Sequence, residues 1–205
     1  MTGFLSRVDN EVSVANLALA YLKEGPLVSL DENRPAARHV AAQFGSVRDA
    51  LLRSHPWNFA RDVATLAEDP TARAGRFSRV YPLPATCLRV LEVEGLDEDS
   101  WTVETRGGLS DDTAPLVPVL CTEATTPKVF FVRTVAEPAL WDALFVQVFA
   151  LELAAVIAPL LGQADAADDL EARAMRRMNR ATRINNREAA RSEVTRSPSF
   201  VTARW

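Results

Sequence analysis

Cysteine and histidine are scarce in this chain of 205 residues, which contains two of each. The two cysteines, Cys87 and Cys121, are too few for a disulfide framework or for a four-ligand zinc site. The sequence also contains no His-x-x-x-His or Cys-x-x-Cys spacing. We therefore expect no metal or cofactor site. We interpret both cysteines as small core residues and expect folding in a reducing cytoplasm.

The motifs of common enzyme classes are absent as well. There is no Gly-x-Ser-x-Gly element, P-loop or dinucleotide-binding fingerprint. His39 and His55 are interpreted as surface or capping residues rather than as general bases. The acidic run Asp97-Glu98-Asp99 stands in a predicted loop, where water solvates its carboxylates, whereas glycosidase chemistry needs two carboxyl groups that face a cleft. We expect no enzymatic activity.

One long apolar segment occurs, over residues 139–161, and polar residues interrupt it at Asp142, Gln147 and Glu152. Each carboxylate would cost about 2.5–3.5 kcal/mol at the centre of a bilayer on an insertion scale. Pro159 adds a break near the end of the segment. We therefore predict a helix that is buried on most sides rather than a membrane span. The start of the chain lacks the pattern of a secretion signal, and none is expected.

Charge is unevenly distributed along the chain. The net charge is −4, but residues 171–205 contain nine arginines and three glutamates, which gives this segment +6 and the remainder −10. A basic segment on an acidic body indicates a polyanionic or acidic partner. Arginine suits such a partner, because its guanidinium pairs with carboxylate or phosphate groups in a bidentate manner. A GC-rich genome is the alternative explanation for arginine in place of lysine.

Apolar residues recur at helical spacing in four segments of the chain. Asp9 or Asn10 can cap the first segment. Pro35 suits the first turn of the second, and Gly162 is typical of the end of the third. The predicted helices span residues 9–24, 33–54, 138–162 and 165–193.

Residues 60–136 differ from the rest, because short apolar runs alternate there with turn signals. Four short antiparallel strands are predicted, around residues 88–93, 101–103, 117–120 and 129–132. Three aromatic residues beside this insertion, Trp57, Phe59 and Trp141, are interpreted as core residues.

The sequence thus predicts an α+β fold that is mainly α. We expect a bundle of about four helices with a small antiparallel β insertion at 60–136. Residues 1–193 are expected to form a single domain. Residues 194–205 are expected to form an extended C-terminal tail, because they carry too little apolar surface to fold alone.

The last predicted helix carries two kinds of side chain on two faces. One face is an apolar seam of Leu170, Ala174, Met178 and Ala181. The other face is a stripe of guanidinium groups, formed by Arg173, Arg176, Arg180, Arg183, Arg187 and Arg191. Such a stripe could neutralise nucleic-acid phosphates, pair with acidic neighbours or simply be solvated. No DNA-reading or RNA-reading motif accompanies it.

Two further stretches carry a resemblance to a known family. The first closes on His55-Pro56 and Trp57-Asn58-Phe59-Ala60, and the second contains Tyr81-Pro82-Leu83-Pro84 followed by Cys87-Leu88-Arg89. Together they resemble the head-to-tail adaptor proteins of tailed bacteriophages, the group that includes tail tubular protein A of short-tailed phages. The resemblance covers most of residues 9–185, and the pair of elements is more specific than either one alone.

The resemblance implies a structural virion protein rather than an enzyme, and no cofactor. Such adaptors form a ring, usually a dodecamer, below the portal protein at the head–tail junction, after assembly in the host cytoplasm. The ring extends the DNA channel without reading sequence, and it offers a platform to the next tail component, whether nozzle, stopper or tail tube. In this family the C-terminal segment usually contacts the portal, which here points to Arg196, Pro198, Phe200 and Trp205. The six arginines of the stripe become candidates for subunit or channel contacts. The alternative is a nucleic-acid-binding protein that uses the arginine-striped helix.

Overall fold

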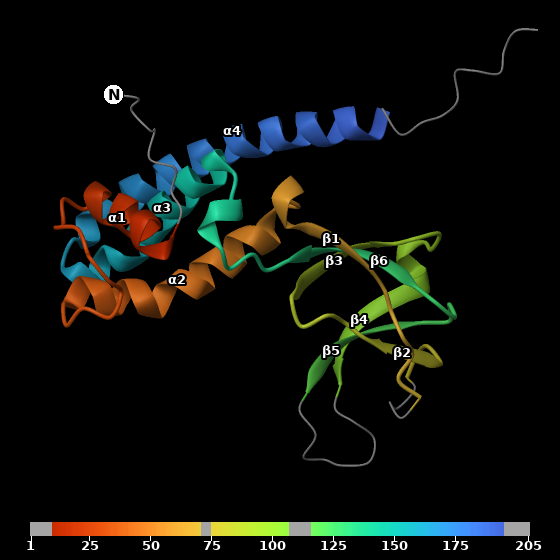
Figure 1. The fold of residues 1–205 in the computed structure, drawn as a ribbon. Helices are drawn as coiled ribbons and strands as arrows, with labels where there is room; N and C mark the ends of the chain where they lie inside the picture. The colour runs from red at the N-terminus through yellow and green to blue at the C-terminus, as the bar shows by residue number, and fades with distance from the viewer. Residues whose placement is uncertain (1–9, 71–74, 107–115, 195–205) are drawn as a thin grey trace, which may run out of the picture. The chain divides into compact units, whose positions relative to one another are not determined.

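The computed structural model describes residues 10–70, 75–106 and 116–194, and the side chains of the last helix as far as residue 189. Within these residues it contains four α-helices and six β-strands, so the fold is α+β and mainly α (Figure 1). The chain divides into two compact units. The helical unit comprises Met1–Phe59 and Val135–Trp205, and the β unit comprises Ala60–Thr134.

The helical unit is organised around its third helix. Its α-helices are α1 (Glu11–Tyr21), α2 (Pro35–Ser54), α3 (Ala143–Ile157) and α4 (Ala167–Val194). Helix α3 packs against α1, α2 and α4, and ten of its 15 residues are buried. This is the apolar segment for which the sequence predicted burial on most sides. No helix among the described residues is long and apolar enough to cross a membrane.

A side-chain cap sets the start of α3, and a short 3-10 turn follows its end. The helix begins later than the expected residue 138, because the Asp142 carboxylate accepts hydrogen bonds from the backbone N–H groups of Leu144 (2.8 Å) and Phe145 (3.4 Å). The preceding Pro138–Leu140 forms a short 3-10 turn instead. At the other end α3 stops at Ile157, before the expected residue 162, and Pro159–Leu161 form a 3-10 turn that Gly162 closes with a left-handed φ of 76°.

The other helices lie close to the expected ranges. Asn10 caps α1 by accepting a hydrogen bond from the Ser13 N–H (2.9 Å). Pro35 occupies the first position of α2, where its missing N–H costs nothing. Helix α4 follows a short 3-10 turn at Ala164–Ala166.

The β unit consists of two three-stranded antiparallel sheets, with strand orders β1-β6-β3 and β2-β5-β4. The strands are β1 (Arg61–Thr65), β2 (Arg79–Pro82), β3 (Cys87–Val93), β4 (Trp101–Arg106), β5 (Val117–Thr122) and β6 (Lys128–Arg133). Strands β3 to β6 correspond to the four predicted ones. The prediction missed β1 and β2, because β1 is almost entirely exposed and β2 has only four residues and ends in proline.

Large side chains from both sheets fill the core of the β unit. Tyr81, Leu120 and Phe131 are almost completely buried there, and the Tyr81 hydroxyl donates a hydrogen bond to the Ala124 carbonyl oxygen. Cys121 is fully buried in this unit, where burial raises the pKa of its thiol. The interpretation of Cys121 as a core residue is therefore confirmed.

Candidate functional site

The most distinctive surface of the helical unit is a row of four arginines on α4. We call Arg176, Arg180, Arg183 and Arg187 the arginine row, and all four side chains are exposed. Steps of four, three and four residues keep them on one face of the helix, over an axial length of about 16 Å. They border a shallow depression of about 530 Å³ that also contains Asn179 and Ile184.

The arginine row has no ion-pair partner within the part of the chain that the structure describes. The predicted stripe also included Arg173, and this residue differs from the row. Its guanidinium lies 3.6 Å from the Asp169 carboxylate and 5.1 Å from the centre of the Tyr21 ring. The row is therefore the part of the stripe that is open to a ligand.

The remaining predicted contact residues cannot be placed in the same way. Arg191 lies within the helical span of α4, but its side chain is outside the described residues. The proposed portal contacts also lie outside the described residues, and these are Arg196, Pro198, Phe200 and Trp205.

The apolar seam of α4 faces the interior, as predicted. Leu170, Ala174 and Ala181 are buried, and Met178 is half-buried. The seam continues to Asn185, which is only 8% exposed and which the sequence analysis did not single out. Asn185 lies one helical turn after Ala181, at a position where the seam is otherwise apolar. That single polar residue is the signal in the sequence that could have identified it.

Asn185 clasps α4 to the segment that follows α2. Its side-chain oxygen accepts a hydrogen bond from the Asn58 N–H (2.9 Å), and its backbone oxygen accepts one from the Asn58 side chain (3.1 Å). Its side-chain nitrogen lies 3.0 Å from Nε2 of His55 and donates to the Pro56 carbonyl oxygen (3.4 Å). This clasp fixes the rotation of α4 about its axis, and therefore the direction in which the arginine row points.

A groove on the same unit has a volume of about 830 Å³. Leu17 and Leu140 on its wall are 40% and 51% exposed. Its polar wall includes Arg177, which donates a hydrogen bond to the Gln147 side-chain oxygen (2.6 Å). The wall of the groove is therefore partly apolar and partly polar.

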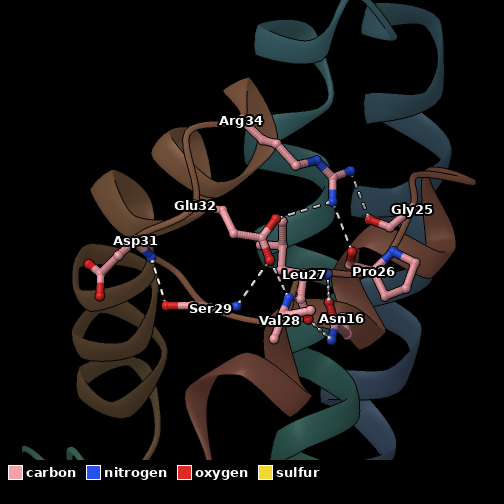
Figure 2. Close-up of polar contacts among 9 residues, drawn as sticks. All are labelled: Asn16, Gly25, Pro26, Leu27, Val28, Ser29, Asp31, Glu32 and Arg34. Carbon is pink, nitrogen blue, oxygen red and sulfur yellow. Dashed lines mark hydrogen bonds and ion pairs between the residues drawn. The ribbon is translucent and has the colours of Figure 1, made fainter.

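The link between α1 and α2 is braced by polar contacts that Figure 2 shows. The Asn16 side chain accepts a hydrogen bond from the Leu27 N–H (2.7 Å) and donates one to the Leu27 carbonyl oxygen (2.9 Å). Arg34 donates to the Pro26 carbonyl oxygen (2.8 Å), and its guanidinium lies 3.5 Å from the Glu32 carboxylate. These contacts hold the link in place. The residue after Leu27 is Val28, which is 90% exposed.

The carboxylate of Glu32 is hydrogen-bonded to the backbone of this link. Its carboxylate accepts hydrogen bonds from the backbone N–H groups of Val28 and Ser29, and these bonds hold the pKa of Glu32 below its usual value (Figure 2). Arg34 adds a smaller effect in the same direction.

Acidic side chains occur at the end of β3 and in the segment that leads from β3 to β4. Glu92, Asp97, Glu98 and Asp99 are all exposed, and we call them the acidic turn. None of them forms an ion pair within the described ranges, whereas the neighbouring Glu94 pairs with Lys128 (2.7 Å). Asp97, Glu98 and Asp99 are therefore open to water, as the sequence predicted for them.

His55 and the possible metal ligands are the remaining chemical groups of interest. His55 follows the last residue of α2 and packs edge-on against the Trp57 ring, with ring centres 5.0 Å apart. Its position confirms the interpretation of His55 as a residue that closes the helix. In the described part of the chain, no cluster of three or more His, Cys, Asp or Glu residues could hold a metal ion.

The residues that carry the family resemblance have packing roles. Trp57 is 1% exposed, and its indole N–H donates a hydrogen bond to the Leu51 carbonyl oxygen (3.1 Å). Its ring packs edge-on against Phe145 of α3 at 5.1 Å, and Phe145 also contacts Phe59 and Trp141. The interpretation of Trp57 and Trp141 as core residues is therefore confirmed, since both are buried.

Comparison of the chain with protein-family models and with curated proteins finds no match in either set. Its function is therefore argued from its own residues and their geometry.

Proposed function

We propose that this chain is a head-to-tail adaptor of a tailed bacteriophage. In this proposal it is a structural, non-enzymatic component of the virion, and about twelve copies form a ring under the portal protein. The ring extends the DNA channel and provides the attachment platform for the next tail component. The four helices form the bundle that builds the ring, the β unit faces that tail component, and the extended tail at 194–205 contacts the portal.

The observation that carries the proposal is the place of the resemblance residues in the fold. Trp57 and Tyr81 come from the two elements that resemble the adaptor family, and both are buried and hydrogen-bonded. Trp57 packs in the helical unit, and Tyr81 packs in the β unit. Buried residues help to determine the fold, so a resemblance at these positions supports a shared architecture. An assembly protein would have that architecture in common with its relatives.

The surface of the chain supports the same proposal. A ring needs two unlike faces on every subunit, because each subunit contacts its neighbours head to tail. The arginine row and the acidic turn are two such surfaces, because both are exposed and their charges are opposite.

The arginine row also favours a second candidate function, which is nucleic-acid binding. Four exposed guanidinium groups without ion-pair partners in the described residues could each contact a backbone phosphate. This candidate requires that affinity for a DNA duplex fall steeply with the logarithm of salt concentration, and that Arg180→Ala reduce that slope by about one.

Native mass spectrometry with the portal protein encoded nearest to this gene tests the adaptor proposal. Portal rings are mixed with the full chain or with a chain that ends at Glu193. A chain that lacks residues 2–9 is the matched control, because it loses a similar length at the other end. We expect stoichiometric addition of the full chain and of the control, and weak or no addition of the chain without the tail.

The other outcomes divide the proposal into its parts. Equal binding by all three chains would keep the adaptor role and refute the role of the tail. If none of the folded chains binds the portal, the adaptor proposal is wrong, and salt-dependent DNA binding becomes the function to pursue.

A further inference from the structure

We infer that the arginine row of one copy of this chain binds the acidic turn of a second copy. The inference rests on the proposed ring, because it identifies a head-to-tail contact between neighbouring subunits. It can nevertheless be tested on the isolated chain, without the portal, so the two proposals can fail independently.

Both surfaces lack ion-pair partners within the described residues of their own chain. Every member of the arginine row and of the acidic turn is exposed, and none forms an ion pair in the described residues. Neighbouring charges behave differently, since Arg173 pairs with Asp169 and Glu94 pairs with Lys128. The row and the turn are therefore two exposed clusters of opposite sign whose charges are available to a partner.

The chemistry of the two clusters also supports the inference. Four guanidinium groups stand on one helical face, and the eight residues from Glu92 to Asp99 contain five carboxylates, four of which form the acidic turn while Glu94 pairs with Lys128. Guanidinium and carboxylate groups form bidentate pairs of defined geometry, so they give register as well as attraction. The row belongs to the helical unit and the turn to the β unit, so each copy presents one unlike half of a head-to-tail contact.

The charge of the whole chain favours a second copy over DNA. Outside residues 171–205 the chain carries −10. This acidic body opposes the approach of a duplex to the row, but it is attracted to the row of another copy. The phosphates of a nucleic acid would pair with the guanidinium groups of the row but would leave the acidic turn without a partner.

The contact should be weak by itself. Exposed ion pairs are screened by salt, and each contributes little to association. Copies held side by side on a portal ring have a high effective concentration, so the same contacts suffice there. The inference therefore predicts a chain that associates weakly and reversibly in solution and that assembles once it is bound to a template.

Sedimentation velocity of the full chain at high concentration tests the inference through a charge swap. Arg180→Glu with Arg183→Glu reverses the centre of the row, and Asp97→Lys with Glu98→Lys reverses the centre of the turn. The wild type should associate at about 0.05 M salt and not at about 0.5 M salt. Each double variant should associate at least about tenfold more weakly. The quadruple variant, in which both surfaces are reversed, should regain most of the lost association.

Matched controls reverse the same number of charges elsewhere. Lys23→Glu with Arg38→Glu changes two exposed basic residues, and Asp31→Lys with Glu137→Lys changes two exposed acidic ones. Both controls should associate within about twofold of the wild type. Circular dichroism of every variant verifies that the helices are retained.

Three results would overturn the inference. The first is a wild-type chain that stays monomeric at both salt concentrations. The second is a quadruple variant that recovers nothing although it is folded. The third is unchanged self-association of the row variant together with a lower affinity for a DNA duplex, which would make the row a nucleic-acid site.

Discussion

The clasp at Asn185 gives the sharpest prediction about stability. Replacing Asn185 with alanine removes the hydrogen bond to the Asn58 N–H (2.9 Å) and the contact with His55 Nε2 (3.0 Å), together with a weaker bond to Pro56 (3.4 Å). Each hydrogen bond contributes about 0.5–1.5 kcal/mol, and a buried group left without its partner costs about 1–3 kcal/mol. We therefore expect Asn185→Ala to reduce the free energy of unfolding by about 2–3 kcal/mol.

Urea unfolding followed by circular dichroism measures this loss. The midpoint should fall while the slope with urea concentration stays the same, because the change affects the folded contacts rather than the surface exposed on unfolding. Asn179→Ala is the matched control, since Asn179 is an exposed asparagine on the same helix, and we expect a change within about 0.5 kcal/mol. A similar loss for both variants would refute the assignment of Asn185 as a clasp.

Further predictions concern three carboxylates of the helical unit. Asp142→Ala removes the cap of α3, including the bond to the Leu144 N–H, and should cost about 1 kcal/mol in urea unfolding. The pKa of Glu32 is lowered in the folded state, so the charged carboxylate stabilises the fold. This stabilisation is complete above the ordinary glutamate range and is lost as the pH falls through and below about 4. In Glu32→Gln the free energy of unfolding should therefore fall less steeply as the pH is lowered. Burial, with a smaller effect from Glu171, raises the pKa of Glu152, so the charged form is disfavoured in the fold. Glu152→Gln should therefore raise the urea midpoint at neutral pH, and the gain should vanish in acid; a lower midpoint at neutral pH would contradict this reasoning.

The parts of the fold that could be predicted are those that local pattern determines. The apolar run around α3 predicts burial without any knowledge of its neighbours, and ten of the 15 residues in α3 are indeed buried. The seam and the row of α4 follow from helical spacing, because residues three and four apart share a face. Gly162 ends the 3-10 turn after α3 for an equally local reason, its left-handed backbone.

The parts that sequence reasoning missed depend on partners far away in the chain. Strand β1 has no apolar alternation of its own and exists because it pairs with β6, more than sixty residues later. Asn185 is a polar residue in an apolar seam, and only the segment at residues 55–58 explains it. Asp142 was treated as an interruption of a helix because its capping bonds form only when α3 starts directly after it.

The most direct test of the adaptor proposal is electron cryomicroscopy of portal rings incubated with the full chain. The proposal predicts class averages with one additional ring below the portal that continues the central channel. Portal particles that remain unchanged in the presence of excess folded chain would contradict it.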